Sequence, residues 1–217
     1  MKKGSFIIAA VLMLLAGIIA PKQAAAQKYQ GQSVVTGGVG FSFVGLLLGV
    51  IDNTVDAATD IRSTKTPVII GAYDYGVSDR FSIGVGYTYQ GMTLKYDSYY
   101  KPNFSGSGDT IVTGNFTDRL SRQNFGIRPL FHFGDIDDLD IYAGLRLSFV
   151  RWSYNTNRPD FDISGATKLL GGVSPIKVQG LFGMRYFFTE NIGFNTEFAI
   201  GPSYLAMVGI NARFGGN

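Results

Sequence analysis

The residues of this chain that could carry chemistry are one histidine, its serines and its charged side chains. His132 is the only histidine, and the absence of cysteine excludes a thiolate nucleophile, a thiolate metal site and a disulfide framework. A histidine acts as a general base when a nucleophile lies within hydrogen-bond reach and an acid orients the ring. Phe133 and Gly134 follow His132, so we expect it beside a turn at a strand end.

Charged residues also occur at positions that the alternation of the chain places in the middle of strands, on one face. They are Asp74, Arg122, Arg128, Arg146, Lys177, Arg185, Glu197 and Arg213. Six cations face two acids in this set. Buried charges need partners or water, so the set indicates a solvated polar plug or a narrow passage that prefers anions. Asp118 and Asp140 are further acids that could supply partners.

A group of aspartates between residues 135 and 140 could attract a cation weakly. Asp135, Asp137, Asp138 and Asp140 lack the spacing and the glycine of a calcium loop. We therefore interpret them as a solvated acidic turn, and we expect no metal site and no cofactor.

Strands must position these residues, because apolar and small or polar residues alternate through most of the chain. Residues 81–90 read FSIGVGYTYQ, with Phe81, Ile83, Val85, Tyr87 and Tyr89 on one face. Successive side chains of a strand point to opposite faces, so a period of two separates two environments. The pattern predicts eight strands, at about residues 34–45, 67–77, 81–95, 118–133, 140–152, 175–188, 192–201 and 204–214. Pro129 lacks a backbone N–H and suggests a bulge.

The two environments predicted by this pattern are lipid and a polar interior. A soluble sandwich has no place for arginines on an inward face, whereas the lumen of a membrane barrel is polar. The fold class that we predict is all-β, an antiparallel eight-stranded transmembrane β-barrel with an N-terminal signal peptide. A soluble, lipocalin-like secreted binder is the alternative.

The N-terminus has the features of a secretory signal. Lys2 and Lys3 precede an unbroken apolar run over residues 6–20, and three alanines at 24–26 suit a cleavage site. The run is shorter than the ~20 residues that a transmembrane helix needs, which weakens the alternative of an N-terminal anchor. We predict residues 1–26 as the signal peptide and 27–217 as the barrel domain.

Removing the signal also removes the apparent basicity of the chain. Without Lys2, Lys3 and Lys22, the 19 Lys and Arg residues become 16, which equals the 16 Asp and Glu residues. A nearly neutral protein without a basic tract gives no electrostatic reason to bind nucleic acid.

The lengths of the connections predict the topology. The connections after the second, fourth and sixth strands are short, whereas residues 46–66, 96–117 and 153–174 form long polar stretches. Short periplasmic turns and long extracellular loops are typical of outer-membrane barrels. Aromatic residues near the strand ends predict two girdles, Tyr75, Phe81, Phe131, Phe133, Tyr186, Phe188 and Phe214 at one end and Tyr89, Phe149, Trp152 and Tyr204 at the other.

With these features the chain resembles the small eight-stranded outer-membrane barrels of Gram-negative bacteria, the family that includes OmpX and the transmembrane domain of OmpA. The resemblance rests on the signal peptide, on VSDRFSIGVGY at residues 77–87 and on GINARF at residues 209–214. It implies that Phe214 is the aromatic residue of the last strand that the barrel-assembly machinery recognises, although three residues follow it here. It also implies contact with outer-membrane lipid and lipopolysaccharide.

The predicted function is that of a surface-exposed structural or interaction scaffold in the cell outer membrane, not an enzyme. Eight strands enclose an interior that side chains fill. His132 is expected at the periplasmic end, far from the outer-leaflet lipid that a lipid hydrolase would need. The long loops, with an apolar first loop and with Tyr96, Tyr99 and Tyr100 in the second, are the expected contacts for an extracellular or envelope protein. A narrow pore or carrier for a small solute or hydrophobic ligand, and an accessory barrel of a secretion or assembly machine, are the alternatives.

Overall fold

The computed structural model describes residues 29–42, 62–101, 110–133, 138–159, 175–201 and 203–215. The predicted signal peptide and most of the apolar first loop lie outside these residues. No helix in the described part is long and apolar enough to span a membrane. Its strands are β1 (Ser33–Phe41), β2 (Arg62–Lys65), β3 (Val68–Ser78), β4 (Phe81–Lys101), β5 (Thr110–His132), β6 (Leu139–Thr156), β7 (Ile176–Phe187), β8 (Ile192–Ile200) and β9 (Ala206–Phe214).

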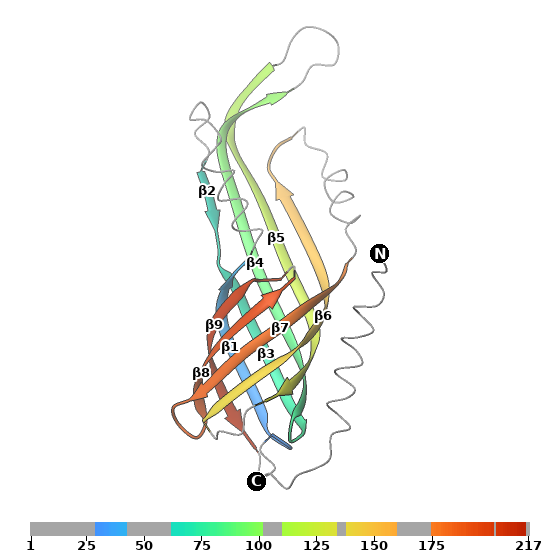
Figure 1. Ribbon diagram of the computed structural model, residues 1–217. Helices are drawn as coiled ribbons and strands as arrows, with labels where there is room; N and C mark the ends of the chain where they lie inside the picture. Colours follow the sequence, from blue (N-terminus) through green and yellow to red (C-terminus); the bar gives the residue numbers. More distant parts are fainter. Residues whose placement is uncertain are drawn as a thin grey trace.

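Eight of these strands close into an antiparallel barrel (Figure 1). Closure occurs at β1, where Val39 lies opposite Ile69 of β3 on one side and Val208 of β9 on the other. Each barrel strand therefore has a hydrogen-bonded neighbour on both sides. This arrangement satisfies the backbone polar groups without an open edge, as a sheet in hydrocarbon must.

The remaining strand, β2, continues the line of β3 along β4. Lys65 of β2 lies opposite Met92, and Ile69 of β3 lies opposite Tyr89. Pro67 separates the two strands because it has no N–H for the ladder. Thr66 compensates in part, since its hydroxyl accepts a hydrogen bond from the Gly91 N–H at 2.8 Å. The end of the predicted 46–66 loop is thus strand.

The predicted period of two is confirmed along the barrel. Outward side chains are apolar and exposed, with Val85 56% and Ile210 64% exposed, whereas Asp74, Arg128 and Arg146 on the inward face are at most 1% exposed. A soluble protein would place these two faces the other way round. The chain is therefore a transmembrane β-barrel of the outer-membrane type, and the soluble alternative is wrong.

The two ends of the barrel differ. Short connections at residues 79–80, 133–138 and 188–191 join consecutive strands at one end, which we call the turn end. At the opposite end, the loop end, β4 and β5 rise far past the other strands (Figure 1). Residues 96–101 and 110–117 belong to these strands, so the predicted second loop is mostly sheet.

The outer face of the long strands shows where the membrane-spanning part ends. On β6 the outward side chains change from Leu147 and Phe149 to Arg151, Ser153 and Asn155. A polar outer face does not suit hydrocarbon, so the strands beyond this level lie outside the membrane. We call this part the sheet extension; it consists of residues 91–101, 110–121 and 152–156.

Three local predictions differ from the structure. Tyr204 precedes β9 and is fully buried, and Trp152 lies on the inward face of β6, so neither belongs to an outer girdle. Pro129 does not form a bulge: Ile127 lies opposite Leu147 and Leu130 opposite Gly144, so the register is the same on both sides of the proline. Only the β5–β6 pairing at residues 128 and 129 is missing.

Candidate functional site

The lumen of the barrel holds a chain of ion pairs that begins at Asp74 on β3. One carboxylate oxygen of Asp74 lies 3.0 Å from Arg128 Nε, and the other accepts a hydrogen bond from Arg185 Nη2. Arg185 Nη1 also donates to Asp140 Oδ2 at 3.3 Å. All four side chains are buried. Two arginines and two aspartates from four different strands are therefore joined in one network.

Glu197 of β8 extends this network toward the centre of the lumen. Its Oε2 accepts hydrogen bonds from Arg128 Nη2 at 2.7 Å and from the Tyr142 hydroxyl at 2.6 Å, and its Oε1 accepts one from the Tyr204 hydroxyl. The Arg185 guanidinium carbon lies 4.5 Å from the centre of the Tyr142 ring. A fully buried carboxylate with three donors is compensated rather than reactive.

A glycine on the neighbouring strand leaves space for the Asp74 carboxylate. Gly84 of β4 lies opposite Asp74, and a Cβ placed on it would approach Asp74 Oδ1 to 2.0 Å and the Tyr73 carbonyl oxygen to 2.4 Å. Any side chain at position 84 would displace the aspartate on which both arginines depend.

His132 lies at the turn end of this network in an arrangement known from hydrolases. Its Nδ1 is 2.7 Å from Asp140 Oδ1, and its Nε2 is 2.8 Å from Ser82 Oγ. An ionised carboxylate can only accept, so His132 Nδ1–H donates a hydrogen bond to Asp140, and with this tautomer Nε2 accepts one from the Ser82 hydroxyl. These contacts have the order of a serine, histidine and aspartate triad.

This triad-like group has no space for a substrate. Ser82 and His132 are 3% and 2% exposed, and the Tyr29 ring stacks on His132 with ring centres 4.4 Å apart. The cavity beside them has a volume of about 10 Å³, room for about one water molecule. Asp140 is shared with Arg185. The group therefore joins β4, β5 and β6, and it leaves no place for a scissile bond near Ser82.

The other predicted site residues lie outside the ion network. Arg122 donates to Gln90 Oε1 at 3.1 Å and to the Ser203 carbonyl oxygen at 2.6 Å. Lys177 is partly buried at the loop end, and Arg213 lies at the turn end with its guanidinium carbon 4.1 Å from the centre of the Phe187 ring.

Two more of these residues differ from the rest in their surroundings. Arg146 is fully buried, and its guanidinium carbon lies 5.9 Å from the centre of the Tyr204 ring. Phe214 ends β9 opposite Ser33 and is 47% exposed.

The sheet extension carries a second cluster, which is aromatic. Tyr96, Tyr99 and Phe116 are each less than 10% exposed and pack together, and the Arg158 guanidinium carbon lies 3.8 Å from the centre of the Tyr99 ring. The Tyr96 hydroxyl donates to Asp118 Oδ2 at 2.9 Å. Burial and this hydrogen bond raise the pKa of Tyr96 to about 12, so its hydroxyl stays protonated at neutral pH.

This arrangement corrects the prediction that Tyr96 and Tyr99 form an exposed recognition surface. The two rings instead hold the extension together, and the side chain of Tyr100 lies outside the described part. Positions on the opposite face, such as Ile111 with 59% exposure, are the ones that face solvent.

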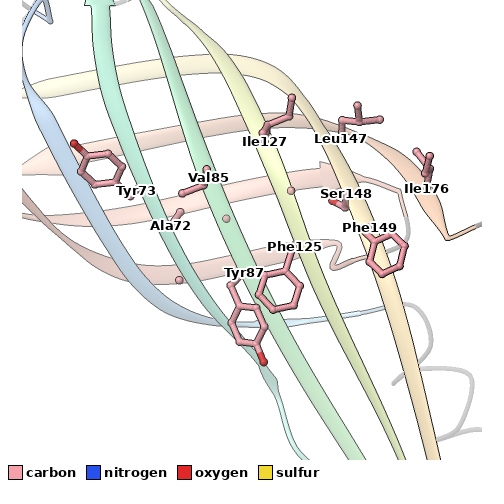
Figure 2. Close-up of a pocket in the computed structure, with 13 residues that line it drawn as sticks. Ala72, Tyr73, Val85, Tyr87, Phe125, Ile127, Leu147, Ser148, Phe149 and Ile176 are labelled. Atoms are coloured by element: carbon pink, nitrogen blue, oxygen red, sulfur yellow. The ribbon is translucent and has the colours of Figure 1, made fainter.

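The outer wall of the barrel has an open hollow of about 740 Å³ between β3 and β6 (Figure 2). Its lining is almost entirely apolar, and the Tyr87 and Phe125 rings lie side by side with centres 4.8 Å apart. Val85 and Ile127 of this hollow point away from the lumen into the membrane region. The hollow is therefore open to the hydrocarbon chains of the surrounding lipid.

Sequence reasoning missed the contacts of three residues in the lumen. Alternation places Ser82, His132 and Tyr142 on the inward face. It does not predict that Ser82 bonds to His132 or that Tyr142 bonds to Glu197. Asp140 was considered only as one of several acids. The inward face of each residue was readable, whereas contacts across the lumen depend on the register of strands far apart in the chain.

Removing the central carboxylate of the network should destabilise the barrel strongly. In an Asp74→Asn variant, Arg128 and Arg185 each lose a charged partner while remaining buried, and breaking a buried pair costs about 3–5 kcal/mol. Urea unfolding in lipid vesicles should show a loss of this size. The matched control is Asp97→Asn, at an exposed position of the sheet extension, where the expected change is within about 0.5 kcal/mol. Equal stability of the two variants would contradict a structural role for the network.

No protein-family model matches the chain, and no curated protein matches it. Among solved structures, a de novo designed transmembrane β-barrel is 13% identical with a TM-score of 0.47, covering 87% of this chain and 99% of that one. The outer membrane protein OprG from Pseudomonas aeruginosa is 12% identical with a TM-score of 0.48, covering 88% and 99%. Ail, the attachment invasion locus protein of Yersinia pestis, solved with the heparin analogue sucrose octasulfate, is 8% identical with a TM-score of 0.41, covering 85% and 99%. Likenesses at this level carry no functional argument, and the barrel architecture rests on the closed sheet and its apolar exterior.

Proposed function

We propose that this outer-membrane barrel is a surface-exposed scaffold whose binding function lies in the sheet extension and the loops around it. The observation that carries this proposal is the ordered sheet that β4, β5 and β6 build beyond the apolar belt (Figure 1). A barrel that only needed to close would not require strands of 21 and 23 residues, since about 9–11 residues cross a membrane.

The orientation follows from the connections. Short turns of outer-membrane barrels face the periplasm and longer connections face outward, which supports an orientation with the sheet extension on the cell surface. In this proposal residues 1–26 direct export and are removed, and Phe214 at the periplasmic end serves the barrel-assembly machinery. Lipid and lipopolysaccharide surround the apolar wall.

The filled lumen supports a scaffold rather than a channel. Leu130, Tyr142, Leu181, Tyr204 and Met207 pack in the interior, each less than 5% exposed. Together with the ion network they leave no wide aqueous path in the part of the lumen that the structure describes. The interior then serves to hold the strands rigidly under the extension.

Site-specific photo-crosslinking in living cells tests where partners bind. A benzophenone amino acid is placed at Ile111 on the sheet extension or at Glu190 in the β7–β8 turn; both positions are exposed. The scaffold proposal expects protein adducts from position 111 with cells or envelope fractions that carry a partner, and none from position 190. Adducts from position 190 alone would overturn it and favour an accessory barrel of a periplasmic assembly or secretion machine.

Single-channel recording tests the alternative of a narrow pore. The protein is inserted into planar bilayers in salt, and insertion is checked by the heat-dependent gel shift of a folded barrel. Because side chains fill the lumen, we expect no discrete current steps. Reproducible steps that change in an Arg128→Gln variant would instead establish a passage through the network.

A serine-directed probe tests the absence of catalysis at Ser82. A fluorophosphonate reacts with a serine that a histidine activates, but Ser82 lies under Tyr29 beside a cavity of about 10 Å³. We expect no labelling of the native protein above that of a Ser82→Ala variant. Labelling at Ser82 in the folded protein would overturn the assignment as a non-enzyme.

A further inference from the structure

The hollow on the outer wall is formed by two neighbouring rows of outward positions, each of which crosses β3, β4, β5 and β6 (Figure 2). The row toward the turn end consists of Tyr73, Val85, Ile127 and Leu147, and the row toward the loop end consists of Gly71, Tyr87, Phe125 and Phe149. The hollow therefore belongs to the membrane-facing wall and is separate from the filled lumen.

The row toward the loop end has no side chain at Gly71. A Cβ built on Gly71 would meet no other atom within 4 Å, so no protein atom lies directly over this glycine. On the neighbouring strands of the same row, the Tyr87 and Phe125 rings pack together with centres 4.8 Å apart. The volume of about 740 Å³ lies within the range of about 300–1,000 Å³ that is typical of ligand sites.

The length of the hollow suits one acyl chain. Between Leu147 and Arg151 the strand β6 rises by roughly 13 Å, at 3.3 Å per residue. This is about half of the ~25 Å apolar band of an outer-membrane barrel, which is the depth of one leaflet. An apolar chain that enters from the loop side can thus lie along the hollow within a single leaflet.

A polar row borders the hollow at its loop end. Gln123 of β5 and Arg151 of β6 lie opposite each other, directly beyond Phe125 and Phe149. Arg151 is exposed and forms no ion pair with any described residue. A guanidinium presents two parallel N–H donors to a phosphate, and the amide of Gln123 can add another. This position therefore suits the phosphate of a lipid whose chain lies in the hollow.

Two further cations lie on the same outward face of the sheet extension. Arg119 of β5 is opposite Thr93, and Lys95 is two residues beyond Thr93 on β4, so the two cations are diagonal neighbours. Both are exposed. Among the outward positions of residues 91–95, 117–123 and 151–155 there is no acid; Asp97 lies beyond Lys95, farther from the membrane. The face above the hollow is therefore cationic and attracts anionic headgroups.

The spacing of these cations indicates two phosphates. Arg119 and Arg151 differ by four residues along the strands and by one strand across the sheet. Strand geometry places their backbones roughly 14 Å apart, whereas Lys95 is within about 8 Å of Arg119. One phosphate thus fits at Arg151 and Gln123, and a second fits between Arg119 and Lys95.

We propose that the outer wall binds one molecule of an acylated disaccharide with a phosphate at each end, the lipid anchor of lipopolysaccharide. One acyl chain lies in the hollow over Gly71, one phosphate is held by Arg151, and the other is held by Arg119 and Lys95. Exposed apolar walls contact lipid in general, but this site selects a headgroup, because its cations stand at two fixed places beside a hollow for the chain.

This inference rests on the proposed orientation, since lipopolysaccharide occupies the outer leaflet and the cations lie at the loop end. The two proposals can fail separately. Lipid binding is measured in detergent, where orientation has no influence, whereas crosslinking from Ile111 requires a protein partner and no lipid site.

Native mass spectrometry of the full protein, purified in detergent and freed of lipid, tests the site. Diphosphoryl lipid A, monophosphoryl lipid A, cardiolipin and phosphatidylglycerol are titrated separately, and the dissociation constant of the first bound lipid is measured. Diphosphoryl lipid A should bind about tenfold more tightly than each of the other three, because only it places phosphates at both groups of cations.

Charge variants locate the headgroup. Arg151→Gln and Arg119→Gln should each weaken the binding of diphosphoryl lipid A about tenfold, since each removes a charged partner of one phosphate. Their matched control is Arg80→Gln, an exposed arginine in the turn between β3 and β4 at the opposite end of the barrel. Arg80→Gln should leave the binding unchanged. The heat-dependent gel shift checks that each variant is folded.

A filling variant locates the acyl chain. Gly71→Phe places a ring in the hollow without a clash, and it should weaken the binding of diphosphoryl lipid A threefold or more while leaving all cations in place. Gly180→Phe is the matched control. Gly180 also faces open space on the outer wall, opposite Leu145, but it does not line the hollow. This control should bind as the wild-type protein does.

Three results would overturn the proposal. Equal affinity for diphosphoryl lipid A and phosphatidylglycerol would show that the wall does not select its headgroup, and tighter binding of cardiolipin would assign the site to another lipid. Unchanged binding in both arginine variants would place the phosphates elsewhere. Unchanged binding in Gly71→Phe would show that the hollow holds no chain of the bound lipid.

Discussion

The closed backbone ladder is the constraint on which the rest of this structure depends. In hydrocarbon an unpaired N–H or C=O costs several kcal/mol, so a sheet that crosses the membrane must pair its last strand with its first. Here β1 does so, with β3 on one side and β9 on the other. Closure in turn gives every strand one face toward lipid and one toward the lumen. The alternation of apolar and polar residues follows from this geometry rather than from a preference of any single residue.

Closure also decides what the lumen must contain. Eight strands enclose only enough space for side chains, and polar side chains there are cut off from bulk water. Their charges must then compensate one another, and they do so between strands that are far apart in the chain: Arg185 and Asp74 are 111 residues apart, and Arg128 and Glu197 are 69 apart. Each such pair fixes the relative position of two strands. Arg146 lies in the same interior beside Tyr204, whose hydroxyl donates to Glu197.

Faces were predictable from the sequence, whereas contacts were not. The inward position of Asp74, Arg128 and Arg185 follows from period two, which depends only on local geometry. Their pairing depends on register and on the tilt of the barrel, which no local pattern encodes. Strand ends beyond the membrane were missed for a different reason. Once β4 and β5 leave hydrocarbon, polar residues enter their outer face, and residues 96–101 and 110–117 then resemble a loop in sequence although they continue the ladder. Tyr204 was misplaced because alternation was extended past the start of β9.

The contacts of Ser82, His132 and Asp140 show why the geometry of a catalytic group is not sufficient for catalysis. Hydrogen bonds of 2.8 and 2.7 Å would orient a base and a nucleophile, but an acyl-transfer site also needs a place for the scissile carbonyl and for water. An eight-stranded lumen has space for a substrate only where its side chains are small or absent. Here Tyr29, Asp74 and Arg185 fill the space beside Ser82 and His132. The side chains that join the strands here thus fill the space beside Ser82 that a substrate would need. In the proposed function, contacts with other molecules belong to surfaces outside the lumen, and the sheet extension is the longest of these that the described strands build.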